Sequence, residues 1–301
     1  MEHNSINMVE VESCVICGSN SFNLFLSCKD HMVSGEDFQI LSCNKCEFKF
    51  TSPRPKDSFL GAYYKSESYV SHTNSKKGVV NKLYHVVRNF TILAKINLLS
   101  KYVSRGTVLD YGCGTGLFLS SIKNYGWDTY GVEPDFDARR IATEAVANVF
   151  SSRDELRSAF INQTFDAITL WHVLEHLTDL TKSLSFFKAS LKPDGVLIIA
   201  LPNYKSYDAN YYKKFWAAYD LPRHLYHFDL KTISALLNNF GFKLVKSKPM
   251  RFDSYYVSML SEKCRTGNIN FFKAFIIGLI SNFVAKGDNS HSSTIYIFKH
   301  K

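Results

Sequence analysis

The stretch Val108-Leu109-Asp110-Tyr111-Gly112-Cys113-Gly114-Thr115-Gly116 decides the fold of this 301-residue chain. It reads as a short apolar strand that ends in an acidic residue, then glycines at alternate positions, then a helical run. Glycine permits tight turns and lets the backbone approach a ligand that a side chain would block. Open α/β sheets build nucleotide pockets from such units, at the carboxyl ends of their strands. The stretch predicts a cofactor loop, although a glycine pattern alone also suits dinucleotide-binding folds and ordinary tight turns.

A second predicted strand, residues 127–133, brings a carboxylate to the same edge of the sheet. It follows a helix that ends at Gly126, a residue type common at helix C-termini. Glu133 closes the strand, and its two acceptor oxygens suit the neighbouring hydroxyls of a ribose. Pro134 fits the first turn of the next helix. The carboxylate beside the glycine loop strengthens the prediction of a nucleotide-type pocket.

Further apolar runs extend this pattern on both sides. Residues 165–172 and 196–203 predict buried strands, with a turn at 191–195 before the second. Strands that alternate with helices imply a right-handed, doubly wound α/β sheet. Ahead of the glycine loop, residues 79–103 have apolar side chains at helical spacing.

Two close cysteine pairs near the N-terminus have the spacing of a zinc ribbon, in which each pair supplies two thiolates to one tetrahedral ion. Four thiolates leave no open position, so the predicted metal is structural. Cys28, between the pairs, is an alternative ligand or a small buried residue. The predicted ligands are Cys14, Cys17, Cys43 and Cys46.

The net charge of +9 is unevenly distributed. Residues 1–60 carry −3 and residues 106–200 carry −4, whereas residues 61–105 carry +7 and residues 201–301 carry +9. Basic segments that flank an acidic nucleotide-binding half suit an anionic partner, and a lysine-rich solvated surface is the alternative. The polar, acidic N-terminus does not resemble a signal peptide, and no apolar run reaches the roughly 20 residues of a membrane span. These features predict a cytoplasmic protein.

Taken together, the ordered motifs resemble those of class I S-adenosylmethionine-dependent methyltransferases. The likeness runs from Val108 to about His227. It rests on the glycine loop, Gly131-Val-Glu-Pro134, Trp171-His-Val-Leu-Glu-His-Leu177 and Leu191-Lys-Pro-Asp-Gly-Val-Leu197. The cysteine pairs and Asp220-Leu-Pro-Arg-His-Leu-Tyr-His-Phe228 resemble a bacterial subgroup with an N-terminal zinc ribbon, whose members often methylate sugars, polysaccharides or lipid-type small molecules.

The resemblance implies a mostly parallel seven-stranded Rossmann-like sheet that binds S-adenosylmethionine. It divides the chain into a zinc-ribbon module (1–55), a helical linker or lid (56–105) and the methyltransferase domain (106–301), with an apolar helical insertion at about 268–286. Tyr63, Tyr64 and Tyr69, in the linker, suit a cofactor cover or simple packing. The implied cofactor-binding residues are Asp110, Gly112, Gly114, Gly116, Glu133, Pro134, Trp171 and His172, with Ser151, Ser152 or Asp154 at the adenine edge.

The segment 220–228 holds the predicted acceptor side. His224 and His227 titrate near neutral pH and are candidates for the base that takes the acceptor's proton. Arg223 is the candidate anchor for a phosphate or carboxylate of the acceptor. Either histidine also suits a structural role, as the cap of the helix that follows or as a partner of Asp220.

Residues 271–284 form an apolar helical pattern whose role the sequence leaves open. A membrane-interface helix, a dimer contact, a lid over a lipidic acceptor and packing on the sheet all fit. The favoured function is methyl transfer to a small, anionic acceptor such as a sugar, nucleotide sugar or lipid-linked intermediate. The alternatives are an RNA methyltransferase that grips phosphates with its ribbon and basic flanks, a nicotinamide-dependent dehydrogenase and a non-catalytic zinc scaffold.

Overall fold

The computed structural model describes residues 7–64 and 79–301. Tyr69 and part of the predicted linker lie outside these ranges. The strands are β1 (Met8–Val9), β2 (Phe22–Lys29), β3 (Asp37–Cys43), β4 (Lys49–Thr51), β5 (Arg54–Pro55), β6 (Thr107–Tyr111), β7 (Asp128–Val132), β8 (Asn148–Phe150), β9 (Phe165–Trp171), β10 (Leu191–Pro202), β11 (Tyr226–His227), β12 (Phe242–Pro249) and β13 (Ser293–His300).

Helices connect these strands and cover the sheets. The α-helices are α1 (Asp57–Leu60), α3 (Val79–Leu99), α4 (Leu117–Lys123), α5 (Phe136–Ala145), α6 (Arg153–Ala159), α7 (Leu180–Ser190), α8 (Tyr207–Tyr212), α9 (Leu230–Asn239), α10 (Asp253–Thr266) and α11 (Phe271–Asp288). Short 3-10 turns are η2 (Gly61–Tyr64), η4 (Leu174–His176), η5 (Lys213–Phe215) and η6 (Ala217–Tyr219).

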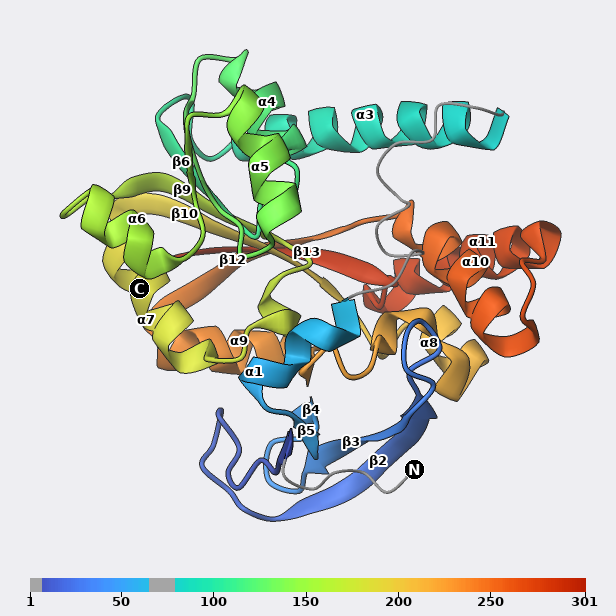
Figure 1. The fold of residues 1–301 in the computed structure, drawn as a ribbon. Helices are drawn as coiled ribbons and strands as arrows, with labels where there is room; N and C mark the ends of the chain where they lie inside the picture. Colours follow the sequence, from blue (N-terminus) through green and yellow to red (C-terminus); the bar gives the residue numbers. More distant parts are fainter. Residues whose placement is uncertain (1–6, 65–78) are drawn as a thin grey trace.

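A seven-stranded sheet forms the centre of the molecule (Figure 1). Its order is β12-β13-β10-β9-β6-β7-β8, and β13 is antiparallel to both of its neighbours. The remaining pairs, from β10 to β8, are parallel. The predicted mostly parallel, doubly wound α/β sheet is therefore confirmed. One detail differs, because the predicted turn at 191–195 belongs to β10 as an irregularity in its pairing with β9.

Successive side chains of β10 enter two different cores, one on each face of the sheet. Val196, Ile198 and Ala200 belong to a core shared with α3, α4 and α5. Leu197, Ile199 and Leu201 belong to a second core, shared with α6, α7 and α9. Successive strand residues point to opposite faces, so a run of apolar residues is buried on both sides.

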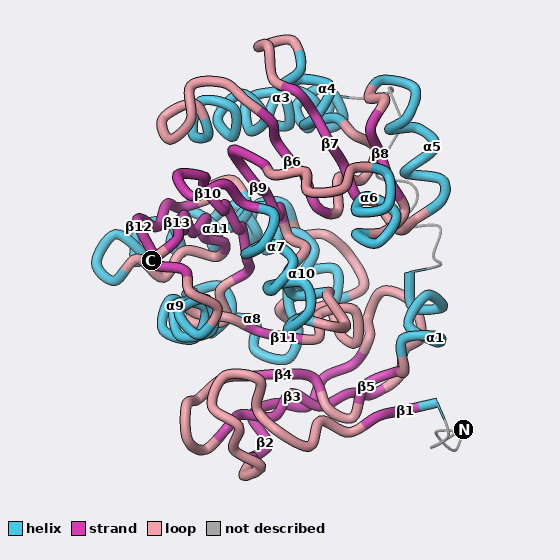
Figure 2. Tube along the Cα trace, turned by 90° about the vertical axis from the view of Figure 1, so that its left-hand side faces the viewer, coloured by secondary structure: helices cyan, strands magenta, loops and turns pink. Residues whose placement is uncertain are grey.

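The N-terminal strands form a smaller layer beside the second core (Figure 2). Its sheet has the order β11-β4-β3-β2, and β11 comes from the segment that follows β10. Phe48 and Phe50 are buried in the same core as α7 and α9. Thr51 extends the contact, because its N–H donates to the Leu225 carbonyl (3.0 Å) and its hydroxyl to the His224 carbonyl (2.6 Å). We call β1–β5 the N-terminal β layer.

Arg223 ties this layer to the rest of the chain. Its side chain is fully buried and donates to Asp30 (2.9 Å), to Asp220 (2.7 Å) and to the Tyr63 carbonyl (2.8 Å). A guanidinium stays charged in proteins, so its burial depends on these acceptors.

The C-terminal helices leave a large apolar surface exposed. α11 packs on α10, and Gly278 lies so close to Tyr255 that an added Cβ would stand 2.7 Å from its ring. On the other face, Phe272 is 77% and Phe283 72% exposed. None of the helices in the described part of the chain combines the length and apolarity needed to cross a bilayer.

Replacement of Asp30 by Asn tests the buried ion pair. The amide keeps the shape of the carboxylate but removes its charge, so we expect Asp30→Asn to lower the free energy of unfolding by about 2–3 kcal/mol in urea titrations. Glu47→Gln is the matched control, because Glu47 pairs with Lys231 in solvent and exposed pairs contribute little. Equal effects of the two variants would contradict this prediction.

Candidate functional site

The glycine loop lies at the carboxyl ends of the parallel strands, where α/β sheets bind ligands. Gly112, Gly114 and Gly116 all have positive φ, at 75°, 54° and 74°. An added Cβ at Gly112 would stand 2.5 Å from Val173, so the turn also needs glycine for space. At Gly114 nothing lies within 4 Å of an added Cβ, which leaves this part of the loop open to a ligand.

Glu133 is held against this loop at the end of β7. Its Oε2 accepts the Gly114 N–H at 2.8 Å, and its Oε1 accepts the Asp135 N–H at 2.9 Å. Arg139 donates to the main-chain carbonyls of Glu133 (2.6 Å) and Pro134 (2.8 Å), which fixes the turn into α5. The carboxylate is half-buried, so it remains accessible to hydroxyl donors.

Asp110, at the end of β6, is the buried acid of the loop. The Thr169 hydroxyl donates to its Oδ1 at 2.6 Å, and the side chain is 2% exposed. Burial raises the pKa of Asp110 to about 7, and the hydrogen bond from Thr169 and the charge of Lys95 only partly oppose that shift.

Trp171 ends β9 beside the loop, and His172 follows it. The Trp171 ring packs edge-on against Phe118, and the Lys95 ammonium lies 4.3 Å from the ring centroid. His172 has φ 58°, and its Nε2 lies 3.1 Å from Asp253. Burial alone would lower the pKa of His172, but the partners Asp253 and Glu175 raise it to about 9. The imidazole is therefore positively charged at neutral pH.

His224 lies within the predicted acceptor segment, in contact with His176 and Glu175. The two imidazole rings meet edge to face, with their centroids 4.5 Å apart. The His224 Nδ1 donates to the Ala218 carbonyl at 2.9 Å. The His176 Nδ1 lies 2.9 Å from the Tyr64 hydroxyl and 3.1 Å from the Arg223 carbonyl. Glu175 is 1% exposed. One potential ligand atom from each of the three side chains lies within 4.8 Å of the others.

The other two residues predicted on the acceptor side are held by protein groups. The His227 Nε2 lies 3.3 Å from the Thr51 hydroxyl, and burial, His224 and Lys49 hold the pKa of His227 well below its usual range. Arg223 is enclosed by Asp30, Asp220 and Tyr63. This geometry favours a positioning role for Arg223 over the predicted anchoring of the acceptor.

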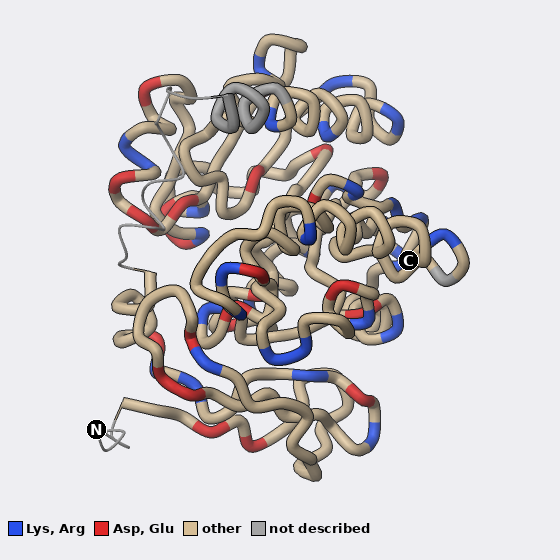
Figure 3. The backbone as a smooth tube through the Cα atoms, turned by 90° about the vertical axis from the view of Figure 1, so that its right-hand side faces the viewer, with Lys and Arg blue, Asp and Glu red and all other residues tan. Residues whose placement is uncertain are grey.

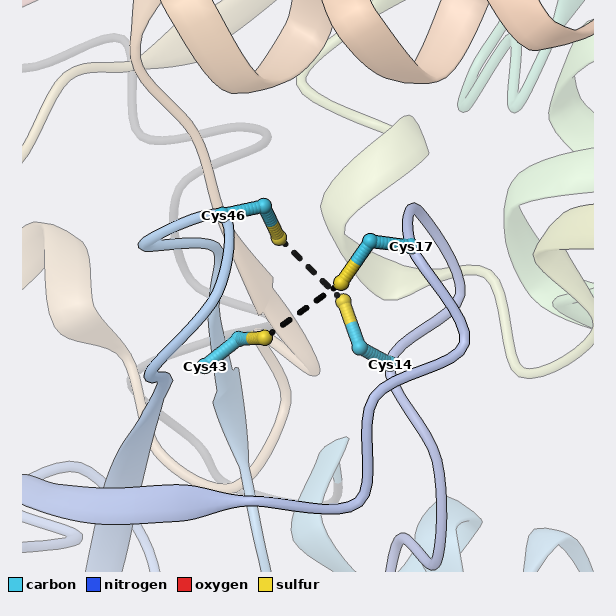
Figure 4. A group of neighbouring side chains, drawn as sticks. All are labelled: Cys14, Cys17, Cys43 and Cys46. Atoms are coloured by element: carbon cyan, nitrogen blue, oxygen red, sulfur yellow. Dashed lines mark hydrogen bonds between the residues drawn. The ribbon is translucent and has the colours of Figure 1, made fainter.

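The predicted cysteine ligands converge at one end of the N-terminal β layer (Figure 4). Cys14 and Cys46 Sγ are 3.5 Å apart, as are those of Cys17 and Cys43. A tetrahedral zinc ion with Zn–S bonds of about 2.3 Å would place its sulfur atoms about 3.8 Å apart. The donor set fits zinc, and it does not include Cys28, which is buried in a different core.

Both cysteine pairs lie in similar backbone turns. The Gly18 N–H donates to the Cys14 carbonyl at 2.8 Å, and the Glu47 N–H donates to the Cys43 carbonyl at 2.9 Å. Gly18 and Glu47 both have positive φ, at 70° and 64°. The repeated turn explains how two separate pairs present their sulfur atoms to one point.

Sequence reasoning missed three charged residues of this site. Lys95 reaches the loop from α3, and Asp253 reaches His172 from α10. Glu175 lies in the segment 171–177 that supports the family resemblance, but the sequence did not predict it as a site residue. A helical stripe marked the side of α3 that packs on the sheet, but no local signal connects Lys95 or Asp253 to a strand end distant in sequence.

The loop, the adjacent carboxylate and the sheet topology fit the Rossmann-like fold of class I methyltransferases. Residues 87–247 match a family described as a methyltransferase domain, and the chain belongs to that family.

Comparison with known proteins gives relatives of the same class. A ubiquinone biosynthesis O-methyltransferase from Actinobacillus pleuropneumoniae is 34% identical over 106 residues, which are 32% of this chain and 45% of that protein. An uncharacterized methyltransferase from Bacillus cereus is 32% identical over 109 residues, which are 35% of this chain and 51% of that protein. The chain thus spans about half the length of the curated relatives it matches.

A solved structure shares the fold. Magnesium protoporphyrin IX methyltransferase from Synechocystis PCC 6803, with bound SAH, aligns with a TM-score of 0.52 and 15% identity. The alignment covers 82% of this chain and 100% of that structure.

The raised pKa of Asp110 predicts a pH-dependent stability. At about pH 5–7 the folded protein holds a proton on Asp110 that the unfolded chain, titrating near 4, has lost. The free energy of unfolding should therefore fall as the pH rises through this window. We expect Asp110→Asn to remove this fall, so that the variant gains stability relative to the unsubstituted protein between about pH 5 and pH 8 in urea titrations without cofactor.

Asp128→Asn, at the exposed start of β7, is the control and should leave the pH profile unchanged. If the free energy of unfolding changed with pH in the same way for Asp110→Asn and the unsubstituted protein, the raised pKa of Asp110 would be contradicted.

Proposed function

We propose that the protein transfers the methyl group of S-adenosylmethionine to an oxygen of a small, anionic acceptor. The observation that carries this proposal is the position of Glu133 beside the glycine loop at the carboxyl edge of the sheet. The relative named as an O-methyltransferase supports oxygen as the acceptor atom. A sugar, a nucleotide sugar or a lipid-linked intermediate would suit the basic C-terminal third of the chain.

Each part of the cofactor has proposed partners in this site. Glu133 takes the ribose hydroxyls, and Pro134 lies near the adenine. Gly112, Gly114 and Gly116 line the methionine and ribose portion, with Asp110 behind them. Trp171 and the positively charged His172 border the methionine moiety. At the adenine edge, Ser151, Ser152 and Asp154 follow the end of β8, where Ser151 donates to Glu155 and Ser152 caps α6.

The reaction we propose is an in-line displacement. The acceptor oxygen attacks the activated methyl carbon, the bond from that carbon to the sulfonium sulfur breaks, and the acceptor loses its proton. The protein mainly aligns the two reactants, and holding them together in the reactive geometry lowers the barrier to methyl transfer. His224 and His227 remain the proposed residues for removing the proton, and His224 lies within 4.8 Å of potential ligand atoms of Glu175 and His176.

The cysteine cluster has a structural role in this proposal. Cys14, Cys17, Cys43 and Cys46 would hold Zn²⁺ and fix the two turns of residues 1–55. Residues 56–105 would then link this module to the catalytic domain, residues 106–301. Four thiolates leave the ion no position for substrate.

An RNA methyltransferase is the rival assignment. On the face shown in Figure 3, Lys and Arg positions are dispersed rather than gathered into one stripe. A long nucleic acid needs many phosphate contacts, and its affinity falls steeply with salt. The dispersed charge favours a small acceptor. Salt-dependent RNA binding at low salt would support the rival instead.

Glu133→Gln tests the cofactor assignment. The variant loses the negative charge that accepts both ribose hydroxyls, and hydrogen bonds to charged groups contribute about 1.5–3 kcal/mol. We expect the Kd for S-adenosylmethionine to rise about 10- to 100-fold in calorimetry. Glu144→Gln, on the exposed face of α5, should bind like the unsubstituted protein. Equal affinity in all three proteins would overturn the assignment.

Replacement of both proposed bases tests the acceptor side. We expect His224→Gln with His227→Gln to keep cofactor affinity while methyl transfer falls about 10²- to 10⁴-fold, because the acceptor proton loses its base. The assay follows labelled methyl from the cofactor into a cell extract and identifies the product by mass. His31→Gln, on the exposed β2–β3 loop, is the control. Full turnover in the double variant would refute both assignments.

A further inference from the structure

Glu175, His176 and His224 form a second cluster of potential metal ligands, separate from the cysteines. Glu175 and His176 belong to η4, at the carboxyl end of β9, and His224 comes from the segment before β11. Glu175 and His224 are buried, at 1% and 8% exposure. We call these three residues the Glu-His-His cluster.

The hydrogen bond of His224 fixes its tautomer. A main-chain carbonyl can only accept, so the His224 Nδ1 bonded to the Ala218 carbonyl carries the proton, and the Nε2 of the neutral imidazole presents a lone pair. The Nδ1 of His176 lies between the Tyr64 hydroxyl (2.9 Å) and the Arg223 carbonyl (3.1 Å). Histidines that ligate metals usually donate their other ring N–H to a carbonyl or carboxylate in this way.

The carboxylate in the cluster lacks the donors that its burial requires. Neither oxygen of Glu175 has a hydrogen-bond partner in the described part of the chain. Glu175 forms an ion pair with His172, whose Nδ1 lies 3.5 Å from Oε1 without forming a hydrogen bond. Asp220 lies 3.9 Å from the His224 Nε2, but Arg223 already binds it. A buried carboxylate without hydrogen bonds is costly, so a further cation at this point would stabilise the arrangement.

We propose that the Glu-His-His cluster binds one divalent transition-metal ion. Two imidazole nitrogens and one carboxylate suit Zn²⁺, Fe²⁺, Co²⁺ or Mn²⁺ better than Mg²⁺ or Ca²⁺, which prefer all-oxygen sites. Three protein ligands leave a position open, as in catalytic metal sites. In this arrangement His224 ligates the ion instead of removing the acceptor proton, and His227 is then the remaining proposed base. Metal binding is measurable without methyl transfer, so it can be tested even if the proposed acceptor is wrong.

The first experiment counts metal ions in the full-length protein. After loading with Co²⁺ and dialysis, we expect two ions per chain by mass spectrometry, one at the cysteines and one at the Glu-His-His cluster. Glu175→Gln should retain one, because it loses the anionic ligand, while its amide can donate to the lone pair of His224. The thiolate-to-cobalt absorption of the remaining ion should persist. His31→Gln, outside both clusters, should keep two ions.

A second measurement does not depend on a folded variant. Crystals of the unsubstituted protein grown with Zn²⁺ should show two anomalous peaks at the zinc edge, one among Glu175, His176 and His224. One ion per chain in solution, together with a single peak at the cysteines, would overturn the proposal. Two ions in Glu175→Gln would overturn it as well.

Discussion

The buried charge of Arg223 is the constraint on which the acceptor side of the molecule depends. A guanidinium with no access to water must be matched by acceptors, and here they come from three separate segments. Asp30 follows β2, the Tyr63 carbonyl belongs to η2, and Asp220 precedes the arginine itself. The same contacts set the position of His224, which follows it, and of the Arg223 carbonyl, which lies 3.1 Å from the His176 Nδ1.

The sequence predicted the parts of the fold that depend on local pattern. Glycines at alternate positions, followed by an apolar helical run, mark a strand–loop–helix unit in any context, and Glu133 was recognisable because it ends the next strand. The cysteine ligands were equally accessible, since the spacing within each pair determines the turn. In each case the residues that identify the feature lie within a few positions of one another.

The remaining parts of the site depend on contacts between distant segments. Arg223 was predicted to anchor the acceptor because a guanidinium suits a phosphate or carboxylate, whereas its partner Asp30 lies 193 positions away in the sequence. Lys95 reaches Trp171 and Asp253 reaches His172 from helices whose sequence patterns mark only a buried side. Glu175 looked like part of a motif, and only the folded chain brings His224 next to it.

The pairing of β4 with β11 makes the sequence of the N-terminal β layer depend on the sequence of the segment around β11. Thr51 and His224 are 173 residues apart, yet the hydroxyl of one donates to the carbonyl of the other. Removing the layer would take the partner strand from β11 and the Asp30 carboxylate from Arg223, which would keep Asp220 as its remaining carboxylate partner. The two segments can therefore be exchanged between proteins only as a matched set, and substitutions in one should be accompanied by substitutions in the other across homologous sequences.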